Sequence, residues 1–192
     1  MTSGAIEIRP ADPTRWGDLE RLFGPRGACA GCWCMWWRLT RAEFNRGQGD
    51  GNRAALRRMV RRGEIPGLIG YVDGVPAGWV CVAPRQAFGA LGRSRVLAPL
   101  DETPVWSVVC FFVARPYRRR GLTVWLLRAA VDFARAYGAT VVEGYPVDPR
   151  GKGYPDTYAY TGTLSAFLQA GFAQAGRRSA SRPIMRCRIL AA

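Results

Sequence analysis

The chain has 192 residues, of which 48% are hydrophobic and 11% aromatic. This length predicts one domain with a substantial core, and the apolar content excludes intrinsic disorder. No apolar run approaches the roughly 20 residues of a membrane-spanning helix, and the first residues lack the basic start and apolar stretch of a signal peptide. We therefore expect a cytoplasmic protein with no membrane partner.

Positive charge dominates, because 28 Lys and Arg residues against 14 Asp and Glu residues give a net charge of +14. A dense cationic surface attracts phosphates, which raises the hypothesis of nucleic-acid binding. The arginines are scattered, however, at helix ends, around a glycine at 118–121 and near the C-terminus. We therefore rank nucleic acid low among the expected partners.

The side chains available for catalysis are restricted, since the sequence has no histidine and six cysteines. Ser-His-Asp and Cys-His mechanisms are excluded, as are zinc sites with histidine ligands. Cysteines in a chain without a secretion signal are expected to stay reduced. The chemistry must then come from Cys, Tyr, Ser, Glu, Asp or a cofactor.

In chain order, residues 5–9 alternate as a strand, and residues 12–23 follow as a helix that Asp12 can cap and Gly24 can end. A Cys- and Trp-rich segment at 24–40 leads to two further helical stretches, 41–46 and 53–62. Two strands come next, joined by the hairpin dipeptide Asp73-Gly74, over residues 67–71 and 75–83.

Residues 84–100 are irregular or hold one short helix. The segment 105–113 is apolar enough for a strand buried on both faces of a sheet. A clear amphipathic helix follows over 121–137, and Gly138 closes it. The remaining elements are a strand, a short helix and a final strand pair, at 140–145, 164–170, 172–178 and 184–190. This order predicts one mixed α/β domain.

The junction between the buried strand and the long helix is the most informative segment. An arginine-rich turn at 118–120 precedes Gly121, which opens the helix. A helix N-terminus offers unpaired N–H groups, glycine lets the backbone approach a ligand, and the arginines add fixed positive charge. The pattern predicts an anion site, although an ordinary strand-turn-helix with a solvated basic corner would have the same sequence features.

The sequence RRRGLT at 118–123 resembles the Arg/Gln-x-x-Gly-x-Gly/Ala motif of the GNAT superfamily of acyl-CoA-dependent N-acetyltransferases. The pair Gly171-Phe172 after a short helix is similar to another landmark of that family. Within the superfamily, the chain resembles an actinobacterial-type subgroup with the signatures CxxCWCMWWR, VVCFFVARPYRRRGLT, EGYPVDP and SRPIMR.

The resemblance implies a single N-acetyltransferase domain over 1–192, in which a mixed, mostly antiparallel sheet with a splayed central strand pair is flanked by helices. Its acyl-CoA-binding core would span about 104–172, and an acceptor-side segment about 24–40. Acetyl-CoA would be the acyl donor, with its pyrophosphate on the amides of 119–123. The residues that would form this turn are Arg118, Arg119, Arg120, Gly121, Leu122 and Thr123.

The resemblance also implies roles for the end of the buried strand. Phe111 and Val113 would pair with the pantetheine arm of coenzyme A like an added strand. An N–H near Phe112 would stabilise the oxyanion that forms when an amine attacks the thioester. Thr123 departs from the usual small Gly or Ala, and Phe167 stands where many members have the tyrosine that protonates the leaving thiolate.

Direct acyl transfer needs a deprotonated amine and is helped by protonation of the departing thiolate. Glu143, at the end of the strand after the main helix, is the best-placed base, acting directly or through water. It is equally interpreted as a solvated carboxylate or as a partner for an arginine. For the acid, Tyr160 leads, although it falls where many members have asparagine; Tyr158 or Tyr154 follow. Each of these tyrosines is also interpreted as a packing residue.

The segment Cys29-x-x-Cys32-x-Cys34 brings three thiols together, but a structural zinc site needs four ligands. We favour packing or pocket lining, expect no metal, and keep an acyl-cysteine intermediate as an alternative. Of the neighbouring tryptophans, Trp33 and Trp36 are candidate substrate-binding residues, in an aromatic box that would accept a cationic amine. A hydrophobic lid is the other interpretation. Other tryptophans are expected in the core, at Trp79, Trp106 and Trp125.

We therefore expect an enzyme that transfers an acetyl group from acetyl-CoA to a primary amine of a small molecule or peptide. One alternative is a non-catalytic acyl-CoA-binding or nucleic-acid-associated regulatory protein, motivated by the net charge and by Phe167. Another is a cysteine-metal interaction module centred on 29–34. Dimers are common in the family, so a homodimer is an expected assembly.

Overall fold

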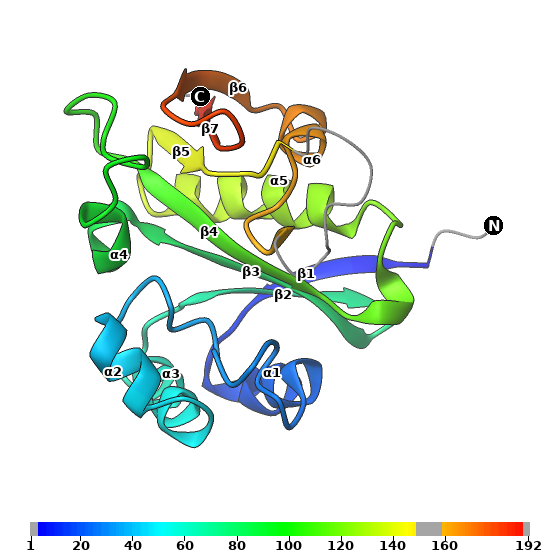
Figure 1. Ribbon diagram of the computed structural model, residues 1–192. Helices are drawn as coiled ribbons and strands as arrows, with labels where there is room; N and C mark the ends of the chain where they lie inside the picture. The colour runs from blue at the N-terminus through cyan, green and yellow to red at the C-terminus, as the bar shows by residue number, and fades with distance from the viewer. Residues whose placement is uncertain (1–3, 149–158, 190–192) are drawn as a thin grey trace.

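The computed structural model describes residues 4–148 and 159–189 (Figure 1). Its strands are β1 (Ile6–Pro10), β2 (Gly67–Val72), β3 (Val75–Pro84), β4 (Trp106–Val113), β5 (Val141–Gly144), β6 (Ala173–Arg177) and β7 (Pro183–Arg188). Its helices are α1 (Trp16–Phe23), α2 (Arg41–Arg46), α3 (Asp50–Arg61), α4 (Gly89–Gly92), α5 (Leu122–Ala136) and α6 (Leu164–Gln169). Short 3-10 turns are η1 (Pro13–Arg15), η2 (Arg85–Ala87) and η3 (Arg115–Tyr117). Within the described ranges, no helix has the length and apolar character to cross a membrane.

Local sequence signals fix most of these boundaries. Asp12 accepts hydrogen bonds from the backbone N–H groups of the first helical turn, and Thr40 forms a capping box with Glu43 at the start of α2. In the predicted hairpin, Asp73 and Gly74 have φ angles of 50° and 75°, the left-handed values that a tight turn between twisted strands requires.

The sheet runs in the order β1-β2-β3-β4-β5-β7-β6. Its neighbouring pairs are antiparallel except for β4 and β5, which run parallel. The sheet is therefore mixed and mostly antiparallel, within a single α/β domain. The sequence prediction of the fold is confirmed.

Helices cover both faces of the sheet (Figure 1). On one face α5 packs along β2, β3 and β4 and buries Leu122, Leu126 and Leu127. On the other face α1 and α3 cover a second core that contains the fully buried Trp79. Trp125 corrects the prediction that it belongs to the core, since it is 50% exposed on the side of α5 that faces away from the sheet.

The sheet opens between β4 and β5. Their pairing covers only Trp106 to Val108 against 142–144, and β4 then continues to Val113. On its other edge, the register with β3 shifts between Cys81 and Val82, so that β4 carries an extra residue there. Beyond this bulge, the β5-facing edge of β4 has no strand partner in the described parts of the chain, which confirms the splayed central strand pair.

Candidate functional site

The predicted anion site lies where β4 passes through η3 into α5. Arg119 and Gly121 both adopt left-handed conformations, with φ angles of 60° and 77°, and Gly121 is the N-cap of the helix. A Cβ at Gly121 would meet no atom within 4 Å, so the space above this backbone is open. Arg118 Nε donates to the carbonyl of Val113 at 3.0 Å, which ties the turn to the end of β4.

Free donors and fixed charge gather at this turn. In the described parts of the chain, the amide N–H groups of 119–123 have no backbone acceptor. The side chains of Arg118, Arg119 and Arg120 are exposed around them. The positive end of a 15-residue helix, α5, adds to the same field. This arrangement can hold a doubly charged group such as a pyrophosphate.

The open edge of β4 begins beside this turn, and the structure modifies two expectations about it. The Phe111 N–H is already used, because it donates to the carbonyl of Tyr160 at 2.6 Å. The N–H of Ala114 donates to β3, so by alternation along the strand the Phe112 N–H also faces β3. Of the amides near Phe112, those on the open edge of β4 are therefore the amides of Phe111 and Val113.

Glu143 occupies a buried network of charges instead of an accessible strand end. Its side chain is 1% exposed, Arg85 Nη1 lies 3.1 Å from Oε1, and Arg186 Nε lies 2.8 Å from Oε2. The Tyr145 hydroxyl donates to Oε1 at 2.7 Å and lies 2.9 Å from Ser107 Oγ. Burial and the charge of Glu143 raise the pKa of Tyr145 well above its usual value.

This network corrects the assignment of Glu143 as a base. A carboxylate that accepts from two guanidinium groups and a hydroxyl, and whose side chain is 1% exposed, is not open to a substrate amine, and Arg85 depends on it as its carboxylate partner. The alternative stated at the sequence level, a partner for arginines, is the one that the structure supports. Arg186 is further held by Asp101, with 2.6 Å between Nη1 and Oδ2, and the contact with Asp101 raises the pKa of Arg186.

Tyr160 lies next to the open edge of β4. Its carbonyl accepts from Phe111, and its ring lies 6.4 Å from that of Trp37. Phe167 is fully buried between Gly144 and Gly162, where an added Cβ would come within 2.2 Å and 2.9 Å of its ring, so it is a core residue. The alternative acids Tyr154 and Tyr158 lie outside the described residues.

The cysteines of the segment 24–40 divide between surface and core. Cys29 is exposed and Cys32 half-buried, whereas Cys34 is buried and accepts a hydrogen bond from Trp79 Nε1 at 3.1 Å. The Cys34 thiol also contacts those of Cys81 and Cys110, and the contact with Cys34 together with burial raises the pKa of Cys81. Within 4–148 and 159–189, no group of three or more Cys, Asp or Glu side chains has a geometry that could hold a metal ion.

The two candidate tryptophans have different surroundings. Trp33 is 4% exposed and packs against Trp16 and Phe23, with ring centroids 6.2 Å and 5.5 Å away. It is therefore a core residue, which corrects its assignment to the substrate box. Trp36 is half-buried and lines a cavity together with Trp37, its neighbour in the Cys- and Trp-rich segment.

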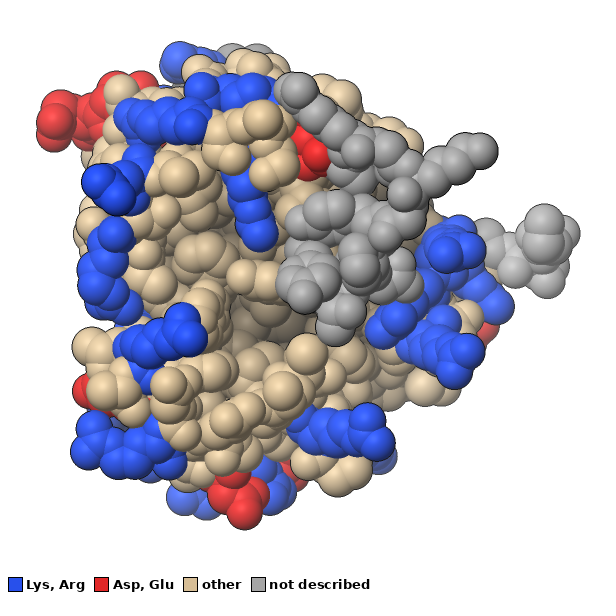
Figure 2. Space-filling view, viewed as in Figure 1, with Lys and Arg blue, Asp and Glu red and all other residues tan. Residues whose placement is uncertain are grey.

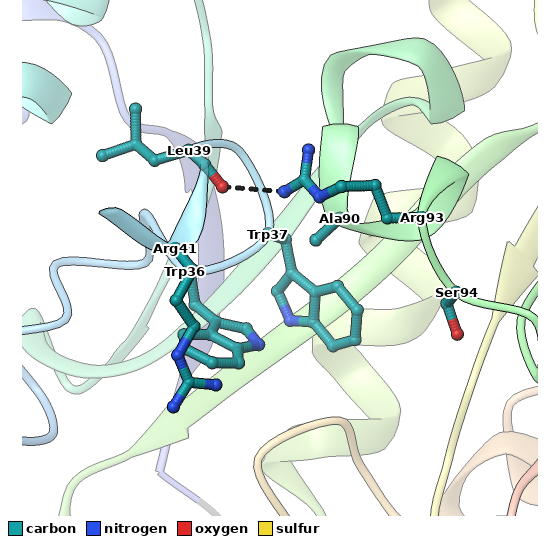
Figure 3. A pocket seen from close by; sticks show the side chains of 7 residues that line it. All are labelled: Trp36, Trp37, Leu39, Arg41, Ala90, Arg93 and Ser94. Atoms are coloured by element: carbon teal, nitrogen blue, oxygen red, sulfur yellow. Dashed lines mark hydrogen bonds between the residues drawn. The ribbon is translucent and has the colours of Figure 1, made fainter. Parts of the chain in front are cut away.

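The cavity has a volume of about 280 Å³ and lies between the end of the Cys- and Trp-rich segment and α4 (Figure 3). The residues that line it are Trp36, Trp37, Leu39, Arg41, Ala90, Arg93 and Ser94. Figure 2 shows this face of the molecule hollowed in its middle, with basic side chains around the rim. Trp37 connects the cavity to β4, since its ring faces Tyr160 and the Tyr160 carbonyl holds Phe111.

Comparison with known proteins agrees with this architecture. The sequence pattern of the Acetyltransferase (GNAT) family matches residues 33–149, which is more than half of the chain. The chain therefore belongs to the GNAT family of acetyltransferases. None of the curated proteins matches the sequence.

Solved structures of low identity share the fold. A GNAT-family acetyltransferase from Listeria monocytogenes has a TM-score of 0.58 and 12% identity, with 98% of this chain and 99% of that chain covered. The PaiA N-acetyltransferase of Thermoplasma acidophilum, in complex with coenzyme A, has a TM-score of 0.54 and 13% identity, with 96% and 99% covered. YncA of Salmonella typhimurium, with acetyl-CoA, has a TM-score of 0.53 and 15% identity, with 96% and 94% covered.

Proposed function

We propose that the protein transfers the acetyl group of acetyl-CoA to a primary amine of a small molecule or peptide by direct attack. The observation that carries the proposal is the turn at 118–123, where unpaired amides, three exposed arginines and a helix N-terminus lie beside the open edge of β4. Family membership and the coenzyme A or acetyl-CoA in two similar structures support the choice of donor.

The donor would lie across this edge of the sheet. Its pyrophosphate would accept from the amides of 119–123, and its pantetheine arm would follow β4 toward the bulge. The Phe111 N–H is the donor that a pantetheine carbonyl would take, so binding would require the Tyr160 carbonyl to give up its hydrogen bond. The acyl carbonyl would then lie near the inner end of the splay.

The reaction would proceed by attack of the free amine on the thioester carbon. The nitrogen forms the new C–N bond, the C–S bond breaks, and coenzyme A leaves as a thiolate that needs a proton. Tyr160 is our proposed acid, because it borders β4 and Phe167 has no hydroxyl to offer. Since Glu143 is held by two arginines, we propose that the amine loses its proton to water.

A non-catalytic acyl-CoA-binding protein is the second candidate. The reason is that Phe167, which is buried in the core, stands where many members of the family that the chain resembles have a tyrosine. Release of coenzyme A thiol from acetyl-CoA, measured with and without a library of amines, separates the two. Acetyl transfer predicts amine-dependent release together with an acetylated product detected by mass spectrometry. Acetyl-CoA binding without release for any amine would favour the binding protein.

A further inference from the structure

The charged side chains that line the cavity beside Trp36 and Trp37 are both arginines. Arg41 lies over the Trp36 ring at 5.3 Å, and Arg93 reaches across the opening to donate to the Leu39 carbonyl at 3.0 Å (Figure 3). Neither guanidinium forms an ion pair with a carboxylate among residues 4–148 and 159–189. The lining contains no acidic side chain.

Among the described residues, Glu43 is a carboxylate on which the charge of Arg93 acts, but it forms its hydrogen bonds elsewhere. Glu43 Oε2 accepts from the Thr40 N–H at 2.9 Å and from the Thr40 hydroxyl at 2.6 Å, as part of the capping box of α2. These hydrogen bonds, with smaller contributions from Arg46 and Arg93, hold the pKa of the Glu43 carboxyl below its usual value. Glu43 is thus held in the helix cap, and the Arg41 guanidinium and the remaining N–H groups of Arg93 stay available to another group.

We propose that this cavity binds the acceptor and selects amines that carry an anionic group, such as a carboxylate, on an aromatic or aliphatic body. The body packs on the Trp36 and Trp37 rings, and the anionic group accepts hydrogen bonds from Arg41 and Arg93. This inference rests on the proposed acetyl transfer and names the class of its acceptor.

The position of the cavity fits this assignment. The ring centroids of Trp37 and Tyr160 are 6.4 Å apart, and the Tyr160 carbonyl accepts a hydrogen bond from the Phe111 N–H on the open edge of β4. An acceptor anchored by its anionic end would therefore extend its amine toward the splay. Two guanidinium groups disfavour polycationic acceptors such as polyamines, because like charges repel across a partly desolvated opening.

The test uses two acceptors that differ only far from the amine, 4-(aminomethyl)benzoate and 4-(aminomethyl)benzamide. Binding of each to the protein saturated with coenzyme A is measured by calorimetry, and turnover with acetyl-CoA is measured separately. Hydrogen bonds to a charged group, discounted for exposed arginines, predict about tenfold tighter binding of the benzoate. Spermidine should bind more weakly than either.

The variants are Arg41→Gln, Arg93→Gln and the two combined. We expect the double variant to reduce the preference for benzoate to near unity and leave the affinity for the benzamide almost unchanged. Arg46→Gln is the matched control, because Arg46 is an exposed arginine of the same helix that does not line the cavity. It removes one positive charge and should keep the preference.

Equal affinity for the two probes, or a preference that survives in the double variant, overturns the inference even if acetyl transfer occurs. A preference that disappears only in the cavity variants supports it. If the benzoate binds selectively but no amine releases coenzyme A thiol, the anion site stands and the proposed acetyl transfer fails.

Discussion

Two arginine-rich regions of this molecule differ in the exposure of their side chains. At the start of α5, Arg118, Arg119 and Arg120 are exposed around amides that have no backbone acceptor in the described chain. Beside β5, Arg85 and Arg186 are 11% and 9% exposed and share one carboxylate, that of Glu143. The side chains of the first region lie at the surface, whereas those of the second pair with a carboxylate inside the fold.

The difference shows that arginine content alone does not locate a site. A guanidinium group keeps its charge at any physiological pH, so burying it requires a fixed anion, and that anion is then lost to chemistry. Exposed arginines at a surface turn can exchange water for phosphate at little cost. The two regions should therefore respond differently to substitution.

Replacing Glu143 with glutamine should have the largest effect. Arg85 would lose its carboxylate inside the protein, and breaking a buried pair in this way lowers the free energy of unfolding by about 3–5 kcal/mol. Chemical denaturation measures this loss. The matched control is Glu7→Gln, because Glu7 pairs with Arg9 at the surface with a side chain that is 51% exposed, and its loss should change stability by less than about 1 kcal/mol.

The same variant separates structure from catalysis. If Glu143 were a base, Glu143→Gln would fold with normal stability and lose turnover that returns at high pH. A stable variant with this pH profile would identify Glu143 as a general base and contradict its role as a structural partner of Arg85 and Arg186.

Tyr160→Phe should reduce turnover by about 100-fold with little change in acetyl-CoA affinity, because a proton donor is typically worth this much and only a hydroxyl is removed. The phenyl ring keeps the packing against Trp37. The control is Tyr137→Phe, because Tyr137 is 60% exposed at the C-terminal end of α5, and this variant should leave turnover unchanged. Wild-type turnover in the Tyr160 variant would assign the acid to water or to another tyrosine.

Gly121→Val should weaken acetyl-CoA binding by at least tenfold, or about 1.4 kcal/mol, because the side chain fills the open space above the turn. Valine is also strained at a φ of 77°, so stability will fall as well. Gly138→Val supplies the control, since Gly138 has a φ of 79° and open space at the opposite end of the same helix. Calorimetry on the folded variants should show a loss of acetyl-CoA affinity for Gly121→Val and not for Gly138→Val. Equal acetyl-CoA affinities of the two variants would contradict an anion site at this turn.

The smallest effect is expected from a chelator. The thiols of Cys81 and Cys110 both contact that of Cys34 inside the core, and we expect no metal at these thiols. Melting temperature should stay the same after incubation with a chelator, because loss of a structural zinc would lower it markedly. Metal analysis that found zinc in the purified protein, together with such a drop, would revive the cysteine-metal module.

Local signals in the sequence were sufficient for most of the fold. Periodicity and caps predicted α5 and the hairpin at Asp73-Gly74, since both depend on neighbours in the chain. The burial of Glu143 could not be predicted, because its two partners come from η2 and β7, far away in sequence. For the same reason Trp33 was misassigned, since Trp16 and Phe23 reach it only after the chain folds back.

The proposed acceptor site shows the same limit. The sequence pointed to Trp36 as a candidate because it lies in a segment rich in cysteine and tryptophan. Arg41 and Arg93 were missed, because they lie on α2 and directly after α4, and nothing in their local sequence differs from the other arginines. Only the folded chain brings them to one opening.

The two guanidinium groups at the cavity also bear on how the reaction should respond to acidity. The sequence contains no histidine, and the pKa of Cys32, Cys34, Cys81 and Cys110 is raised, chiefly by burial and by contacts among the thiols. Arginine keeps its proton throughout the same range. A rate that rises with pH near neutrality would then report the ionisation of the acceptor's own ammonium group, so the profile would shift from one amine to the next and serve as a signature of the substrate.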